Sequence, residues 1–332
     1  MSSTPFRLGL CLPVRPSRGE VDFEHPRRWG CLRGELHRQI TAAIGALPNV
    51  SVVPVDFRDS VIRDGAVWVN GVDVAEAIDG LFWYCEIDRA PGAFHRDVLH
   101  TLARRVPVSP DPTRWGDAVD KFRAHTLLRD AGVPVPECVL VDPHAPFGAL
   151  EPILERWGAA MLKPRWGAWG HGVMLVEHAA QLRDLLGFVR SRTPDDLRGI
   201  LLERYHDNDP ERWVGVTVVG GQVVYGYKKR AGKRVELGNG RTKVFDPEQR
   251  GGDVDLAVLT DEHRRIAVRA AAALDCPILG FDMIETAKGP LVVDENTSPG
   301  NYAPLYEEAG TSAADAFASA VGAFIECAKT MP

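Results

Sequence analysis

The alternation of apolar and polar residues along the first third of the chain predicts an α/β unit. Residues 6–12 and 50–55 are short apolar runs, and residues 80–84 carry no charge, so each run predicts a β-strand. Residues 32–46 place apolar side chains at helical spacing and predict an amphipathic helix. Strands that alternate with a helix are typical of a lobe built on a parallel sheet.

Turn-forming residues divide the rest of the chain. Residues 62–72 predict a hairpin that turns at Asp64-Gly65 and is inserted into the first lobe. Three prolines between Val106 and Pro112 cannot continue a helix or a central strand and predict a boundary. Later helices are predicted near residues 179–190 and 312–328. We therefore expect an α/β protein with a Rossmann-like N-terminal lobe and two α+β lobes, over residues 1–112, 113–198 and 199–332.

Residues 280–300 predict two short strands that bring oxygen ligands together. Asp282 lies on the first strand, and the second strand ends with Asp294 and Asn296. Residues two apart on a strand share a face, so these three side chains can converge, whereas Glu295 should point away. Two carboxylates and an amide oxygen suit Mg²⁺ that shares its other positions with water and phosphate. The alternative is a hairpin with a polar end.

A lysine and a glycine-rich turn between residues 161 and 176 predict a phosphate site. Lys163 precedes Gly167, Gly170 and Gly172, and an apolar run follows them. Glycines permit backbone conformations that turn N–H groups toward a polyanion. The spacing differs from that of a P-loop, in which the lysine follows the glycines and opens a helix.

These motifs, in this order, resemble those of the ATP-grasp superfamily over about residues 110–325. The similarity is to the carboxylate–amine ligases of the glutathione synthetase, D-alanine–D-alanine ligase and RimK-like group. It rests on the Asp120-Lys121 helix, the Lys163-Pro164 strand, the glycine-rich turn, a hinge strand at residues 200–205, and Asp294-Glu-Asn296 before Pro299-Gly300. Asp294 stands where that group usually has glutamate.

The resemblance implies roles for individual residues. ATP would be bound by lysines, loop residues and the hinge, namely Lys121, Lys163, Gly167, Gly170, His171, Gly172, Glu203, Tyr205 and Asp209. Glu203 would accept a hydrogen bond from the adenine amino group, unless it is only an exposed acid at the end of a strand. Asp209 would hold the ribose, although Asp207 and Glu211 also qualify. His171 is a candidate general base or a solvated phosphate contact.

A basic segment follows a predicted hairpin that turns at Gly220-Gly221. By the resemblance, Lys228 or Arg230 would contact phosphate and Arg241 would contact the substrate carboxylate or acyl phosphate. The alternative is a solvated hairpin. Many ligases of this group carry an arginine where this chain has Gly215, which puts their donor-carboxylate site in question here. Arg15 and Arg18, after the first strand, are further substrate-binding candidates.

Composition narrows the classes of partner. The chain has 332 residues and a formal net charge of −6, which provides no general attraction for nucleic acid or an anionic membrane. The apolar run at residues 6–12 is too short for a signal peptide or a membrane span. The six cysteines lack zinc-type spacing, which favours reduced thiols. We expect a cytoplasmic protein, and a homodimer is the default expectation.

The function implied by the resemblance is ATP- and Mg²⁺-dependent ligation of a carboxylate to an amine. The carboxylate would become an acyl phosphate, and ADP and phosphate would be released. An amino acid or small carboxylic acid as donor and a small amine as acceptor would suit small-peptide or natural-product biosynthesis, including cyclisation. The alternatives are a kinase for a small polyol and a nucleotide-binding module without catalysis.

The metal assignment makes a first prediction. Asp294→Asn should abolish turnover because the substitution removes a negative charge from the Mg²⁺ site. Steady-state ADP release measures this, and a rate near that of the wild type would remove Asp294 from the metal site.

Overall fold

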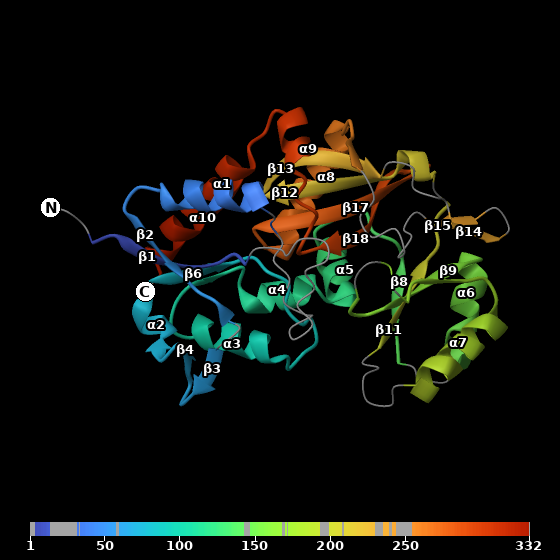
Figure 1. The fold of residues 1–332 in the computed structure, drawn as a ribbon. Helices are drawn as coiled ribbons and strands as arrows, with labels where there is room; N and C mark the ends of the chain where they lie inside the picture. The colour runs from blue at the N-terminus through green and yellow to red at the C-terminus, as the bar shows by residue number, and fades with distance from the viewer. Residues whose placement is uncertain are drawn as a thin grey trace.

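The computed structural model describes residues 4–13, 32, 34–57, 60–142, 147–167, 170, 172–192, 199–207, 209–229, 235–238, 241–243 and 254–331. Three main sheets succeed one another across the molecule, with the N-terminal sheet on the left of Figure 1 and the small sheet of β8–β11 on the right. The largest sheet lies above and between them. The predicted α/β architecture is confirmed.

The N-terminal sheet is parallel and has the order β2-β1-β6-β7. Its strands are β1 (Phe6–Cys11), β2 (Val50–Pro54), β6 (Gly80–Trp83) and β7 (Val108–Ser109), and the helices of this region are α1 (Gly34–Gly45), α2 (Val74–Ala77) and α3 (Phe94–Ala103). All four residues of β6 are buried because helices cover both faces. Leu81 packs in the core that contains residues of α3, and Phe82 packs in the core that contains residues of α1. The three strands predicted from the first lobe are therefore present.

The predicted hairpin is also present, as β3 (Ser60–Arg63) and β4 (Ala66–Val69), with a short third strand, β5 (Val72–Asp73). Asp64 and Gly65, at the turn, have φ values of +52° and +76°. Positive φ at both central residues is typical of a type I′ turn, whose twist matches that of the strands. Aspartate and glycine tolerate this conformation, which explains why the local sequence was sufficient for the prediction.

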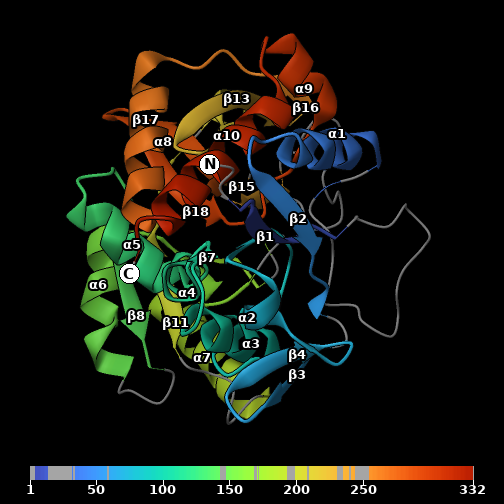
Figure 2. The same ribbon diagram turned by 90° about the vertical axis from the view of Figure 1, so that its left-hand side faces the viewer.

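The largest sheet is antiparallel, with the order β16-β13-β12-β17-β18. Its strands are β12 (Val214–Val219), β13 (Gln222–Lys229), β16 (Val254–Leu256), β17 (Ile278–Thr286) and β18 (Gly289–Asn296), and the later helices are α8 (Asp261–Leu274), α9 (Ala303–Glu308) and α10 (Ala313–Ala328). Helix α10 packs against α1 (Figure 2), and Phe317 and Val321 join Leu8 and Phe82 in one core. The C-terminal helix, grouped with the third lobe by sequence, thus covers the N-terminal sheet.

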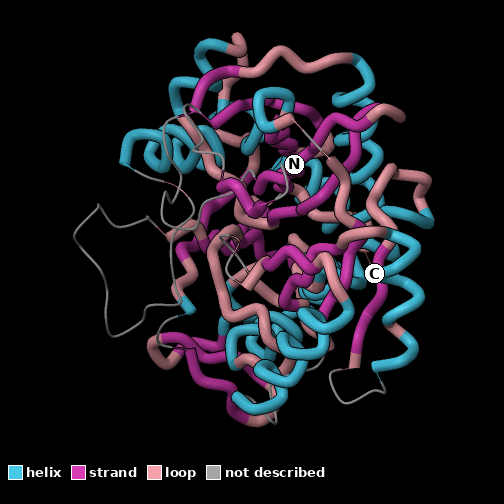
Figure 3. The backbone as a smooth tube through the Cα atoms, turned by 90° about the vertical axis from the view of Figure 1, so that its right-hand side faces the viewer, coloured by secondary structure: helices cyan, strands magenta, loops and turns pink. Residues whose placement is uncertain are grey.

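The side of the molecule that carries the small sheet and its helices is nearest the viewer in Figure 3, and this sheet has the antiparallel order β10-β9-β11-β8. Its strands are β8 (Cys138–Val141), β9 (Ala160–Pro164), β10 (Met174–Val176) and β11 (Ile200–Arg204), and the accompanying helices are α6 (Glu151–Trp157) and α7 (Ala179–Arg192). Leu154 and Trp157 of α6 and Leu182 and Leu186 of α7 pack on this sheet. A separate pair, β14 (Val235–Gly238) and β15 (Arg241–Lys243), forms a two-stranded sheet.

Helices α4 (Pro112–Ala118) and α5 (Lys121–Asp130) lie between the lobes and pack against α8. Ala124 and Leu128 of α5 belong to the core that includes residues of the largest sheet. The helix that carries Lys121 is therefore held in a core that also contains residues of the N-terminal lobe, and the lobe boundaries derived from sequence stay predictions. In the described part of the chain, no helix has the length and apolar character needed to cross a membrane.

Candidate functional site

One row of residues crosses the largest sheet and defines the floor of the candidate site. Tyr227 on β13 is paired with Gly215 on β12, Gly215 with Asp282 on β17, and Asp282 with Asp294 on β18. Directly paired residues share a face of a sheet, so Asp282 and Asp294 project on the same side. Asn296, two residues beyond Asp294, lies on this side as well.

Two lysines from different elements reach these carboxylates. Lys121, at the start of α5, forms an ion pair with Asp294. Lys163, on β9, donates to Glu203 Oε1 at 2.6 Å and to the Val293 carbonyl at 3.0 Å. Burial lowers the pKa of Lys121, but the carboxylates of Asp294 and Glu295 outweigh it and raise that pKa to about 12. Lys121 is therefore protonated at neutral pH.

The pKa values of the two carboxyl groups shift in opposite directions because their neighbours differ. Burial raises the pKa of Asp282 to about 6, and the negative charge of Asp294 adds to this effect. Burial also acts to raise the pKa of Asp294, but Lys121 and Lys163 outweigh it and lower that pKa. Both residues are only partly buried, so their carboxylate oxygens can reach a cation as well as the neighbouring lysines.

The donor set fits Mg²⁺. Asp282, Asp294 and Asn296 would hold the ion through hard oxygen atoms, although Asn296 Oδ1 also accepts a hydrogen bond from the Ser298 N–H at 2.9 Å. In the part of the chain that the structure describes, no group of three or more His, Cys, Asp or Glu side chains is arranged to hold a metal. A bound ion would therefore need phosphate or water to complete its coordination.

Glu295 lies on the opposite face of β18, as parity predicts, but it is not remote from the site. It is paired with Phe281, a core residue, and is 7% exposed. Burial raises its pKa to about 8, with Lys121 opposing this effect. The expectation that Glu295 would simply point away was therefore incomplete, because the helix that carries Lys121 packs on this side of the strand.

Glu203 is buried on β11, which excludes the alternative of an exposed acid at a strand end. Its Oε1 accepts from Lys163, whereas its Oε2 lies 3.7 Å from His125 Nε2. Within the described residues, neither Glu203 Oε2 nor His125 Nε2 has a hydrogen-bond partner. Buried polar atoms are normally bonded, so this pair fits a position where a ligand or water supplies the missing partner.

The other predicted hinge residues lie nearby in the sequence but are less enclosed. The Tyr205 N–H donates to the Ala159 carbonyl at 3.1 Å, so this donor is already used within the small lobe. Asp209 is exposed, and its Oδ1 accepts from the Glu211 N–H at 3.0 Å. Their contacts with adenine and ribose stay predictions.

The glycine-rich turn requires glycine at two of the three predicted positions. Gly170 and Gly172 have φ values of +67° and +73°, a region that other residues rarely adopt. The third, Gly167, offers its carbonyl to Arg89 Nη1 at 2.9 Å. His171 and Arg230, with Arg15 and Arg18, lie outside the described residues, as does the side chain of Arg241, whose backbone is in β15.

The parity of β13 separates Lys228 from its neighbour Lys229. Lys228 is exposed, whereas Lys229 shares a face with Tyr227 and lies with its Nζ 4.6 Å from the centre of the Trp213 ring. Burial lowers the pKa of Lys229, and Asp282 and Asp294 oppose this effect, so the Lys229 charge faces the metal carboxylates. Lys229 is therefore a further candidate cation on this strand, and the contact of Lys228 with phosphate stays a prediction.

Tyr227 explains the glycine at position 215. A Cβ atom on Gly215 would lie 2.3 Å from the Cε1 and Cζ atoms of the Tyr227 ring. Any larger side chain would displace the ring, which also packs edge-on against Trp213. An arginine at position 215 is thus incompatible with this arrangement, and the site must draw any further guanidinium from elsewhere.

An ion pair that sequence reasoning missed connects the lysine-bearing elements. Arg165, directly after β9, donates from Nε to Asp120 Oδ1 at 2.9 Å and approaches Oδ2 through Nη2 at 2.8 Å. Asp120 is 3% exposed and also caps α5 by accepting from the N–H groups of Phe122 and Arg123. The Lys121 N–H donates to the Arg165 carbonyl at 3.2 Å. These bonds hold the first residue of α5 beside the end of the Lys163 strand.

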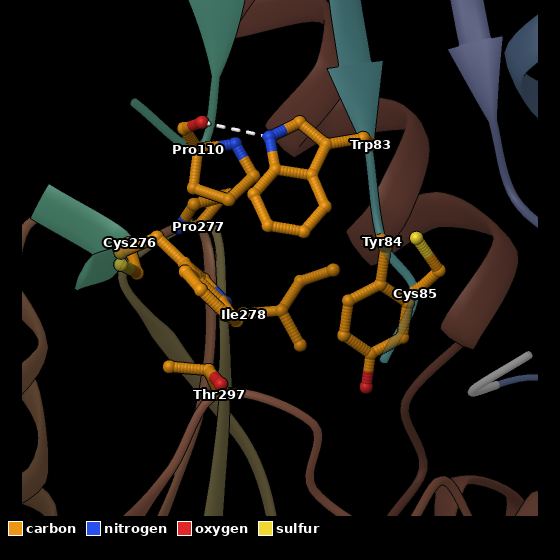
Figure 4. A pocket seen from close by; sticks show the side chains of 9 residues that line it. Trp83, Tyr84, Cys85, Pro110, Cys276, Pro277, Ile278 and Thr297 are labelled. Carbon is orange, nitrogen blue, oxygen red and sulfur yellow. Dashed lines mark hydrogen bonds between the residues drawn. The ribbon is translucent and has the colours of Figure 1, made fainter. Parts of the chain in front are cut away.

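A pocket at the junction of β6, α4 and β17 is a separate feature (Figure 4). The Trp83 Nε1–H donates to the Pro110 carbonyl at 2.8 Å beside it. Its walls are largely apolar and comprise Trp83, Tyr84, Cys85, Pro110, Trp115, Cys276, Pro277, Ile278 and Thr297. None of the residues predicted to bind nucleotide or metal lines this pocket, so we do not assign it to either.

The Arg165–Asp120 pair predicts a measurable coupling. Arg165→Ala should lower the free energy of unfolding by about 3 kcal/mol because the buried Asp120 carboxylate would lose its closest ion pair and keep the more distant Arg123, at 3.7 Å. Urea denaturation measures this loss. Asp120→Asn retains the helix cap, so the double variant should recover part of the loss; strict additivity of the two single effects would contradict the coupling.

The buried His125 predicts a pH dependence of stability. Burial, followed by the charge of Lys163, lowers the pKa of His125 from 6.5 to about 3. Between these values the unfolded chain binds a proton that the folded chain does not. The contribution of His125 is therefore complete above the unfolded pKa and declines as the pH falls, by up to about 1.4 kcal/mol per pH unit.

His125→Gln should flatten this slope between about pH 6.5 and pH 5 because glutamine does not titrate. Urea denaturation at stepped pH measures the slope. The exposed His178 provides the control, since His178→Gln should leave the slope unchanged. Equal slopes for wild type and His125→Gln would contradict the neutral, buried state of His125.

Comparison with known proteins places this site in a family. Residues 118–320 match the RimK-like ATP-grasp domain. The chain is 29% identical over 213 residues to a probable alpha-L-glutamate ligase of Xanthomonas axonopodis pv. citri (strain 306), a match that covers 61% of this chain and 65% of that protein. It is 29% identical over 185 residues to the ribosomal protein bS6–L-glutamate ligase of Escherichia fergusonii, covering 55% and 57% of the two chains. The matched part thus spans less than two thirds of either relative.

The similarity to solved structures extends over nearly the whole chain. The crystal structure of D-alanine–D-alanine ligase from Bacillus anthracis superposes with a TM-score of 0.64 at 16% identity, over 98% of this chain and 99% of that one. At this identity the likeness concerns the fold, and it confirms the ATP-grasp fold expected from the sequence. With a domain match that covers more than half of its residues and with this fold, the chain belongs to the RimK-like ATP-grasp family.

Proposed function

We propose that this protein is an ATP-dependent carboxylate–amine ligase that releases ADP and phosphate. The observation that carries the proposal is the cross-strand pair Asp282–Asp294 facing Lys121, with Lys163 from the small lobe beside it. Acids that favour a cation, next to lysines that favour phosphate, form a site for a metal–nucleotide complex. Two relatives are named as glutamate ligases, and these names support the same class of reaction.

The nucleotide would lie between the small sheet and the largest sheet. Glu203 Oε2 would accept from the adenine amino group, and the phosphates would lie against Lys121, Lys163 and the glycine-rich turn. In the unliganded structure these lysines bind Asp294 and Glu203, so nucleotide binding would exchange those pairs for phosphate contacts. Mg²⁺, held by Asp282, Asp294 and Asn296, would offset phosphate charge.

The reaction then follows from charge and position. An oxygen of the donor carboxylate attacks the γ-phosphorus in line, the bond to the β,γ-bridging oxygen breaks, and ADP leaves. The nitrogen of the amine attacks the acyl carbon, and phosphate departs with the carbon–oxygen bonding electrons as the nitrogen loses a proton. Lys121, Lys163 and Lys229 would stabilise the negative charge that moves through these steps.

The substrates we propose are an amino acid or small carboxylic acid as donor and a small amine as acceptor. Glutamate is the first candidate because it occurs in the names of both relatives, one of which modifies a ribosomal protein. A role in small-peptide or natural-product biosynthesis, a cytoplasmic location and a homodimeric state remain predictions from the sequence.

The test is Mg²⁺-dependent turnover with pooled amino and carboxylic acids and hydroxylamine as a surrogate amine. ADP, phosphate and a hydroxamate should appear together and depend on one acid, because hydroxylamine traps an acyl phosphate. Lys229→Ala should lower the rate by more than about tenfold, whereas Lys228→Ala, its exposed neighbour, should change the rate less than about twofold. Stoichiometric transfer of phosphate to a polyol without phosphate release would instead establish a kinase.

A further inference from the structure

Arg89 brings a guanidinium from the N-terminal lobe to the candidate site. It lies in the segment that follows β6, beyond the carboxyl end of this strand, and it is partly buried. The order of the parallel sheet reverses between β1 and β6, and ligands of open α/β sheets lie beyond the strand ends at such a reversal. Arg89 is therefore placed where the N-terminal lobe would meet a substrate.

The backbone of the glycine-rich turn orients this side chain. Arg89 Nη1 donates to the Gly167 carbonyl at 2.9 Å. The positive charge of Arg89 also lowers the pKa of both Lys121 and Asp294, although burial and other charges have larger effects on these two groups. The charge of Arg89 therefore reaches the expected nucleotide and metal positions. The Arg89 side chain thus connects the N-terminal lobe with the glycine-rich turn of the candidate site.

The donors of Arg89 are mostly unused. Among the described residues, its side chain makes a single hydrogen bond, to Gly167, which leaves the Nε and Nη2 groups available. Three of the other cations here already form ion pairs, because Lys121 binds Asp294, Lys163 binds Glu203, and Arg165 binds Asp120. A planar guanidinium with adjacent donors matches the two oxygens of a carboxylate.

The largest sheet offers a lysine but no guanidinium beside Asp282. At position 215 on β12, next to Asp282, the Tyr227 ring fills the space that a side chain would occupy. A donor carboxylate that approaches the γ-phosphate near Asp282 and Asp294 would therefore meet Lys229 on this sheet and could meet a guanidinium only from the lobe that faces it.

We propose that Arg89 binds the carboxylate of the donor acid and retains it as the acyl phosphate forms. Its bond to Gly167 holds the guanidinium in the orientation required. This assignment rests on the proposed ligase function. It implies that the N-terminal lobe recognises the donor acid through the carboxylate that reacts. The nucleotide would be bound by Lys121, Lys163 and Glu203, which lie outside the N-terminal sheet.

The test compares Arg89→Ala and Arg89→Lys with Arg104→Ala, a control at an exposed arginine of the same lobe. Three quantities are measured for each variant: the Kd of Mg·ADP without donor, the half-saturating concentration of ATP, and that of the acid which supports hydroxamate formation in the wild type. Thermal melting of each variant establishes that it is folded.

Arg89→Ala should raise the half-saturating donor concentration by about 30-fold because a charge-assisted hydrogen-bond pair is lost. Its two nucleotide constants should change less than about threefold. Arg89→Lys should recover part of the donor affinity because it keeps the charge but not the fork. Arg104→Ala should match the wild type.

Two results would overturn the assignment while the ligase stands. Donor saturation in Arg89→Ala equal to that in Arg104→Ala would remove Arg89 from the site, and an equal loss for Mg·ADP would make it a nucleotide contact. If the wild type forms hydroxamate from no acid, the ligase proposal itself fails and the donor site fails with it.

Discussion

Buried charge in the space between the sheets is the constraint on which the rest of the structure depends. Lys163 reaches from the small sheet to Glu203 and to the carbonyl of Val293 on the largest sheet, while Lys121 reaches Asp294 from α5. Taking an ion out of water costs several kcal/mol, and only close partners offset that cost. These charges therefore require that α5, β9, β11 and β18 be held in fixed relative positions.

The surrounding elements meet this requirement by ordinary packing. Ala124 and Leu128 hold α5 in the core that also contains residues of α8 and the largest sheet, and Asp120 ties its first turn to Arg165. Two of the buried polar atoms that lack a hydrogen-bond partner in the described chain, Glu203 Oε2 and His125 Nε2, lie beside the same lysine, Lys163. A framework that is rigid around incompletely paired polar atoms is prepared to bind a ligand with little reorganisation.

The placement of the candidate site residues depends on strand pairing and on contacts between distant segments. Lys228 and Lys229 are adjacent and equally charged, and only the pairing of β13 with β12 decides that Lys229 faces Asp282. The alternation of Tyr225 and Tyr227 with Lys229 was the available signal, since large aromatic residues at every second position mark the inward face. Arg89 and Arg165 had no such signal, because each acts through a partner more than forty residues away.

The sequence by itself determined the strands of the N-terminal lobe, the Asp64-Gly65 turn, the β17–β18 ligand strands and the order of motifs that identifies the family. These features depend on residues close together in the chain, where periodicity and turn preferences act directly. Only the tertiary structure decided that α10 covers the N-terminal sheet, that Tyr227 occupies the space beside Gly215, and that Glu203 is buried against Lys163. These contacts depend on strand register and on packing between distant segments, and local sequence patterns do not specify either of them for individual residues.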